Sequence, residues 1–169
     1  VLLAAIASVS MLLGTAPAVA ETPPDYDCKA GAVIIVGGAN DPDGRFLVGV
    51  TERYTGRKPI IDPDGNLQIV DDPASPYRGD GAFTILYADY ATTLWPLGSP
   101  GYDEDVARGV ASTEQLIADY QSHCGGKTVV VAGYSQGARV AGDVLSDLGN
   151  GRTTTVAAAD GTPVTIDTS

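Results

Sequence analysis

The sequence predicts an α/β fold in which helices flank a parallel sheet. Segments typical of strands and segments typical of helices alternate along residues 32–148. The strand-like run at residues 32–36 is continuously apolar, and those at residues 83–87 and 128–132 consist almost wholly of apolar or β-branched residues, as in strands that are covered on both faces. The helical segments carry apolar side chains on one face. This order of elements favours parallel strands joined by right-handed crossovers.

Residues 1–20 have the features of a secretory signal peptide. Residues 1–14 are almost wholly apolar, and Ala18 and Ala20 form an A-x-A cleavage site that makes Glu21 the expected mature start. The charged n-region is expected to precede the first residue given. The alternative is an uncleaved membrane anchor, but this apolar run is shorter than the roughly 20 residues of a membrane span. We expect a protein that is secreted or held in the cell envelope, without stable membrane insertion after cleavage.

The folded domain is expected to occupy residues 21–169. Its first strand at residues 32–36 runs into a loop of small residues at 37–42, and a short helix follows from Phe46 to about Gly56. Two apolar pairs around residues 62–65 indicate a turn that could join the two arms of a hairpin.

A second buried strand is predicted at residues 83–87, followed by a loop at 88–101. A long helix then spans residues 101–125, with acidic residues in its first turn and an apolar stripe along one face. Residues 153–158 indicate a further strand or one arm of a hairpin.

The segment at residues 128–138 combines a strand, a tight turn and the start of a helix. Gly133 and Gly137 flank Ser135 where the strand turns directly into the helix, and side chains at these two positions are expected to clash. Gly149 is expected to end this helix as its cap. The pattern is the G-x-S-x-G nucleophile elbow of an α/β-hydrolase. The alternative is an ordinary strand–helix junction with a small residue at the bend.

An elbow serine needs donors for the oxyanion that forms during acyl transfer. One expected donor is the backbone N–H of Gln136, the residue after the nucleophile. The other is expected from the loop after the first strand, at the N–H of Ala39. The alternative for this loop is a flexible connection without a catalytic role.

The general base is not evident in the sequence. The only histidine, His123, precedes the elbow strand and is expected at the opposite edge of the sheet from Ser135, as a cation near a helix C-terminus. In α/β-hydrolases the acid and then the histidine follow the serine. The aspartates that follow are Asp143, Asp147, Asp160 and Asp167. None is a convincing acid, so we expect a C-terminally incomplete domain, catalytically weak by itself, whose acid and base lie in further sequence.

Composition limits the classes of partner. The net charge of −11 and the pI of about 4.2 argue against nucleic acid. Cys28 and Cys124 fit one disulfide in an exported protein, the alternative being two free thiols. Residues 41–44 and 62–65 superficially look like calcium loops but lack the ligand pattern, and no zinc spacing or phosphate loop is present. We therefore expect neither a metal nor a cofactor.

Three segments resemble the PE-PPE domain of mycobacteria and their relatives. Residues 36–42 are similar to its G-G-T-G-x-P loop, residues 102–109 to its Y-D-x-S-V-x-x-G helix start, and residues 133–138 match its G-Y-S-Q-G-A elbow, which cutinases share. Cys28 and Cys124 are also placed like a cutinase disulfide. The loop favours PE-PPE over cutinase, although Ala39 and Asn40 replace the threonine and glycine of that loop.

This resemblance implies a secreted serine esterase that acts on short or medium acyl esters, with Ser135 as nucleophile and Gln136 and Ala39 as oxyanion donors. The expected substrate is an ester or a lipid. Two alternatives stay open: an acyltransferase of cell-envelope lipid assembly, and an exported domain that keeps the elbow without catalysis. The oligomeric state is not predicted.

Overall fold

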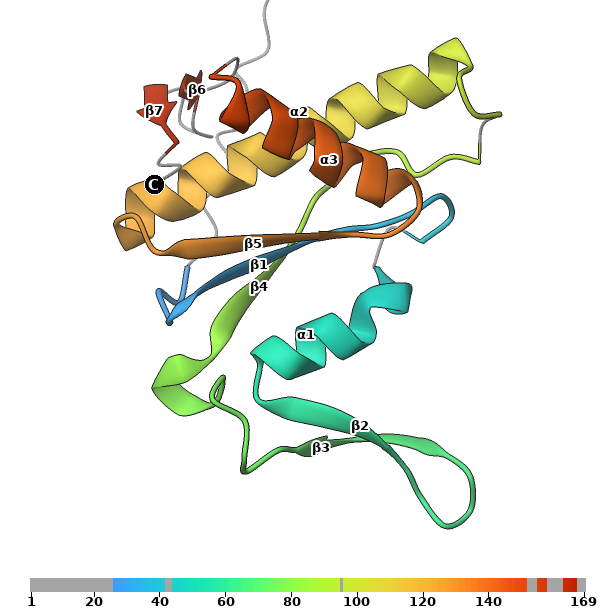
Figure 1. Cartoon of the computed structure of the whole chain (residues 1–169), viewed down its shortest axis with the longest axis vertical. Coiled ribbons are helices and arrows are strands. Elements are labelled where there is room, and N and C mark those ends of the chain that lie inside the picture. Colours follow the sequence, from blue (N-terminus) through green and yellow to red (C-terminus); the bar gives the residue numbers. More distant parts are fainter. Residues whose placement is uncertain (1–25, 42–43, 95, 152–154, 158–162, 167–169) are drawn as a thin grey trace, which may run out of the picture.

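A parallel sheet of three strands lies at the centre of the fold, in the order β4-β1-β5 (Figure 1). The strands are β1 (Gly31–Val36), β4 (Phe83–Tyr87) and β5 (Thr128–Gly133). This computed structural model describes residues 26–41, 44–94, 96–151, 155–157 and 163–166. The predicted signal peptide at residues 1–20 lies outside them. The α/β class predicted from the sequence is confirmed.

The middle strand, β1, is buried along its whole length. Its side chains alternate between two apolar clusters, as the pleat of a strand requires. Ile34 and Val36 join the cluster under the long helices, whereas Val33 and Ile35 join the cluster around Phe83 on the other face. A continuous apolar run was therefore the right signal for a strand that is covered on both faces.

Helices cover both faces of this sheet (Figure 1). One face carries α2 (Pro100–Cys124) and α3 (Gln136–Gly149), and the other carries α1 (Val48–Tyr54) with the 3₁₀ turn η1 (Arg45–Leu47) before it. The predicted apolar stripes are buried where α2 and α3 meet the sheet. Their buried side chains include Val106, Ile117, Tyr120, Val140, Ala141 and Val144.

Two hairpins stand outside the parallel sheet. The strands β2 (Arg57–Ile61) and β3 (Leu67–Asp71) pair antiparallel, which confirms the predicted hairpin. A 3₁₀ turn, η2 (Gly79–Gly81), then leads into β4. Near the end of the chain, β6 (Thr155–Ala157) pairs antiparallel with β7 (Pro163–Thr165), so the expected hairpin arm is present.

Two details of the prediction were wrong. We expected β4 and β5 to be buried on both faces, but both are only half-buried because each is an edge strand of the described sheet. We also expected Gly149 to cap α3. It is instead the last helical residue, and the left-handed glycine that follows the helix is Gly151, with φ of 65°.

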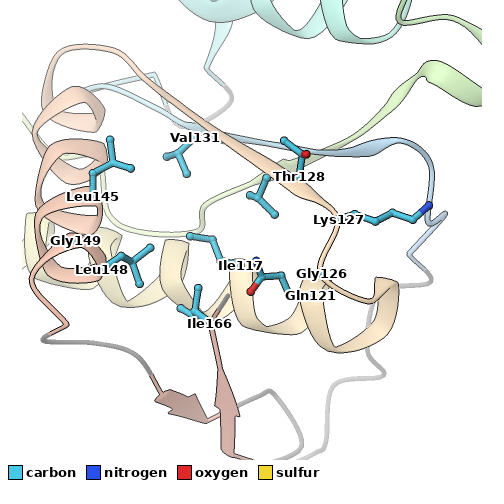
Figure 2. Close-up of a pocket in the computed structure, with 11 residues that line it drawn as sticks. Ile117, Gln121, Gly126, Lys127, Thr128, Val131, Leu145, Leu148, Gly149 and Ile166 are labelled. Carbon is cyan, nitrogen blue, oxygen red and sulfur yellow. The ribbon is translucent and has the colours of Figure 1, made fainter. Parts of the chain in front are cut away.

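The half-buried state of β5 leaves an open pocket of about 410 Å³ beside it (Figure 2). Its apolar wall includes Ile117, Val131 and Leu148, together with Leu145, whose side chain is 63% exposed. Neither Ser135 nor the loop after β1 lines this pocket. It is therefore separate from the predicted catalytic turn.

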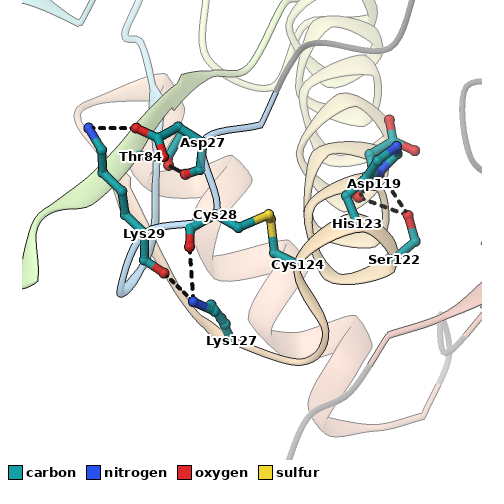
Figure 3. Close-up of a disulfide and its surroundings, with 9 residues drawn as sticks. All are labelled: Asp27, Cys28, Lys29, Thr84, Asp119, Ser122, His123, Cys124 and Lys127. Atoms are coloured by element: carbon teal, nitrogen blue, oxygen red, sulfur yellow. Dashed lines mark hydrogen bonds and ion pairs between the residues drawn. A yellow bond between two sulfur atoms is a disulfide. The ribbon is translucent and has the colours of Figure 1, made fainter. Parts of the chain in front are cut away.

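A disulfide joins Cys28, just before β1, to Cys124, the last residue of α2 (Figure 3). The Lys127 ammonium group donates hydrogen bonds to the carbonyl oxygens of Cys28, at 2.9 Å, and Lys29, at 2.7 Å. These contacts fix the entry to β1 against the entry to β5. Within the described ranges, none of the helices is both long and apolar enough to cross a membrane.

Candidate active site

Ser135 lies in the turn between β5 and α3, at the carboxyl end of the sheet. Its backbone has φ of 55° and ψ of −117°, a conformation that residues with a side chain rarely adopt. Ser135 is the N-cap residue of α3, yet its side chain makes no capping hydrogen bond. Its hydroxyl is thus presented on an exposed, sharply bent turn instead of being used to hold the helix.

The flanking glycines are required by close backbone contacts. A Cβ atom on Gly133 would lie 2.1 Å from the carbonyl oxygen of Gly137. A Cβ atom on Gly137 would lie 2.1 Å from the carbonyl oxygen of Val36 and 2.5 Å from that of Gly37. Because these are main-chain carbonyl oxygens, making room for a Cβ atom would require the backbone itself to shift. The clash expected from the sequence is therefore present, and Gly137 brings the turn against the end of β1.

The loop after β1 lies directly against this turn. A Cβ atom on Gly38 would be 2.9 Å from the carbonyl oxygen of Tyr134 and 3.2 Å from Cβ of Ser135. The backbone N–H of Tyr134 also donates to the carbonyl oxygen of Val36, at 3.4 Å. The structure therefore brings the segment that contains Ala39 to the serine, although the two are almost a hundred residues apart in the sequence.

Each predicted oxyanion donor directly follows a residue of this contact in its own segment, Ala39 after Gly38 and Gln136 after Ser135. Gln136 is the first residue of α3, so its N–H has no acceptor within the helix. Ala39 follows Gly38 in the loop. No described residue accepts a backbone hydrogen bond from either N–H. The N-terminus of α3 adds the positive end of a helix dipole at the same place.

A second segment braces the loop after β1. The hydroxyl of Tyr90, which follows β4, donates a hydrogen bond to the carbonyl oxygen of Gly37. The N–H of Asn40, whose φ is 58°, donates to the carbonyl oxygen of Thr92 at 2.6 Å. Burial raises the pKa of Tyr90 to about 12, so its hydroxyl stays a donor throughout the physiological range. Sequence reasoning missed this brace, since no local motif marks it.

Asp41 fixes the other end of the same loop. Its carboxylate is 1% exposed and accepts hydrogen bonds from the N–H groups of Arg45, at 2.9 Å, and Phe46, at 3.3 Å. Burial alone would raise the pKa of Asp41, but these hydrogen bonds and the Arg45 guanidinium outweigh burial and lower it. The carboxylate therefore stabilises the turn that leads into η1.

Asp62 has a similar structural role in the β2–β3 hairpin, where it accepts hydrogen bonds from the backbone of Asp64 and Asn66. Asp41 and Asp62, the first carboxylate of each calcium-like segment, thus stabilise turns. In the part of the chain that the structure describes, no group of three or more His, Cys, Asp or Glu side chains could hold a metal ion.

His123 precedes Cys124 of the disulfide at the end of α2 (Figure 3). It lies before β5, whereas Ser135 follows that strand. Its Nδ1 is 2.7 Å from the carbonyl oxygen of Asp119, and its ring is 5.2 Å from that of Tyr26. The six residues of β5 alone span about 20 Å. His123 is therefore too far away to remove a proton from Ser135.

The acidic residues after the elbow are not placed to complete a triad. Asp143 pairs with Arg139 on α3, at 2.8 Å. Asp147, one turn further along α3, lines a surface hollow with the same two side chains. Asp160 and Asp167 lie outside the described residues. The described part of the chain thus brings together a serine and two N–H groups, without an adjacent acid and base.

Comparison with known proteins gives one match. A family model described as Cutinase matches residues 76–162, which is about half of the chain. The matched region begins before β4 and includes Ser135 and Gln136, whereas Ala39 and Cys28 precede it. Neither the curated proteins nor the solved structures contain a match.

Proposed function

The chain belongs to the cutinase family of serine ester hydrolases, and from this premise we propose that it cleaves short or medium acyl esters through an acyl-enzyme on Ser135. The oxyanion donors in this proposal are the N–H groups of Gln136 and Ala39. The acid and the base are contributed by sequence outside the described residues.

The contact between the loop after β1 and the elbow carries this proposal. Gly38 has no room for a Cβ atom next to Tyr134 and Ser135, and this close approach supports an oxyanion donor at the next residue, Ala39. A strand–helix junction without catalytic function does not need a second backbone segment at its bend. It also does not need a serine with positive φ whose hydroxyl leaves the helix N-terminus uncapped.

In the proposed reaction, the Ser135 oxygen attacks the ester carbonyl carbon while a base takes the hydroxyl proton. The carbonyl oxygen becomes an oxyanion, which the two N–H groups and the N-terminus of α3 stabilise. The C–O bond to the alcohol then breaks, and the alcohol leaves with the proton. Water attacks the acyl-enzyme in the same way and releases the acid.

Two finer parts of the proposal rest on the sequence. The loop at residues 36–42 favours a relative of the actinobacterial PE-PPE domain within this group of esterases, and residues 1–20 favour export by a signal peptide. The disulfide between Cys28 and Cys124 supports an oxidising compartment. Peptide sequencing of the exported protein, with Glu21 as the expected first residue, tests export.

Hydrolysis of a chromogenic butyrate ester by the intact protein tests the activity. We expect turnover that Ser135→Ala lowers by at least about a thousandfold. Adding a primary alcohol distinguishes the acyltransferase alternative, because a transferase would form the new ester faster than the free acid. Full turnover by Ser135→Ala would exclude Ser135 as the nucleophile.

A further inference from the structure

We propose that Phe46 and Tyr134 form an aromatic platform that binds the acyl chain of the substrate. The two rings stack with their centroids 4.9 Å apart and their planes 27° apart. This inference rests on the proposed esterase function, since it assigns the acyl site to the same nucleophile.

The aromatic platform lies at the reacting residue. Tyr134 directly precedes Ser135, and a Cβ atom on Gly38 would be 3.2 Å from Cδ1 of the Tyr134 ring. Phe46 belongs to η1, which follows the loop that carries Ala39. The two rings therefore come from the two segments that form the elbow and the oxyanion site.

Both rings are open to solvent although they are large and apolar. Phe46 is 69% exposed and Tyr134 is 46% exposed, so their stacking leaves most of the Phe46 surface in water. An apolar chain laid on this surface would remove it from water. The acyl group becomes bonded to Ser135 in the first half-reaction and leaves only in the second, whereas the alcohol departs in the first. The site beside Ser135 therefore suits the acyl part.

The backbone beneath Phe46 is held in place. The buried carboxylate of Asp41 accepts hydrogen bonds from the N–H groups of Arg45 and Phe46. Gly44, whose φ is 61°, allows the chain to turn there, and a Cβ atom on it would lie 2.3 Å from Cγ2 of Ile35 in the core. The main chain at Phe46 is thus tied to a buried carboxylate.

The first test is the dependence of kcat/KM on acyl length, measured with p-nitrophenyl butyrate, hexanoate and octanoate on the intact protein. Full burial of one methylene group raises kcat/KM by about fourfold, and contact of a methylene with one ring face raises it by about twofold. The native protein should therefore prefer octanoate to butyrate by about sixteenfold, and Phe46→Ala by only about fourfold. Ile61→Ala, which removes a side chain that is 67% exposed on the distant hairpin, should keep the native ratio.

The second test does not need turnover. In Ser135→Ala protein, NMR should detect intermolecular NOEs between the alkyl protons of ethyl octanoate and the ring protons of Phe46 and Tyr134. Absence of these NOEs, or a native octanoate preference in Phe46→Ala, would overturn the platform. If no ester is hydrolysed but the NOEs are present, the platform stands as an alkyl-binding site and the proposed hydrolysis fails.

Discussion

The buried carboxylate of Asp41 anchors one end of the loop after β1. Asp41 is two residues after Ala39 and holds the turn into η1 through two backbone N–H groups. Its pKa is lowered because these hydrogen bonds and the Arg45 guanidinium favour the ionised form more strongly than burial opposes it. Ionised Asp41 therefore stabilises the fold and shapes the loop beside Ser135.

Replacing Asp41 with Asn should lower the free energy of unfolding at pH 7 by about 1–3 kcal/mol, because charge-assisted hydrogen bonds are lost. A carboxyl group whose pKa is lower in the folded state stabilises above its unfolded pKa of about 3.9. That contribution disappears as the pH falls through the folded pKa. Urea unfolding at several pH values should show the difference shrinking below about pH 4. A difference that grows in acid would contradict this assignment.

Tyr90 is the second residue on which the loop depends. Tyr90→Phe removes the hydrogen bond to the carbonyl oxygen of Gly37 and keeps the buried ring. We expect a loss of about 0.5–1.5 kcal/mol in stability. We also expect a lower kcat with little change in KM, since the loop would hold Ala39 less firmly in the transition state. Equal kcat values for the two proteins would show that the brace does not act on catalysis.

At the scale of elements, the elbow depends on how closely β1, β5 and α3 approach one another. Gly137 allows α3 to start within contact distance of the end of β1, where even one methyl group would meet two carbonyl oxygens. Gly142, one helical turn and a half later, has no atom within 4 Å of its Cβ position. The same helix thus contains a glycine that the site requires and one that it does not.

Gly137→Ala should therefore destabilise the protein by about 3 kcal/mol or more and abolish reaction at Ser135. Gly142→Ala should instead stabilise it by up to about 1 kcal/mol, because alanine is the better helix former. Thermal unfolding of the two variants beside the native protein measures this contrast. Equal effects of the two substitutions would mean that the contact with Val36 does not constrain the elbow.

The sequence predicted elements whose signal is local and long. The alternation of apolar runs and helical stripes gave β1, α2 and the elbow close to their observed bounds. The sequence did not predict features that depend on contacts between segments far apart in the chain. The partial exposure of β5 follows from its position at the sheet edge, and the Tyr90–Gly37 hydrogen bond joins residues 53 positions apart. Neither feature leaves a periodic pattern in the residues themselves.

Across the whole molecule, the disulfide and the turn that carries Ser135 lie at opposite ends of β5. The bond between Cys28 and Cys124 closes a loop with a sequence separation of 96 residues, which contains β1, β4 and α2. Closing a loop of this length stabilises the fold by about 4–5 kcal/mol when chain entropy dominates. The disulfide therefore stabilises the sheet at the end of β5 that is remote from Ser135.

Reduction of the native protein should lower its free energy of unfolding by about 4–5 kcal/mol. A variant with Cys28→Ser and Cys124→Ser should show a similar loss and no further response to reductant. Guanidinium unfolding with and without dithiothreitol measures both. If reductant left the stability of the native protein unchanged, Cys28 and Cys124 would not be bonded in solution.

The central claim is that Ser135 is an activated nucleophile beside an oxyanion site. Reaction of the intact protein with a fluorophosphonate, followed by mass spectrometry of its peptides, tests this claim most directly. The account predicts one phosphonyl group, located on Ser135, and no labelling of Ser135→Ala or of protein unfolded before the reaction. Labelling that persists in Ser135→Ala, or an intact folded protein that is not labelled at all, would contradict it.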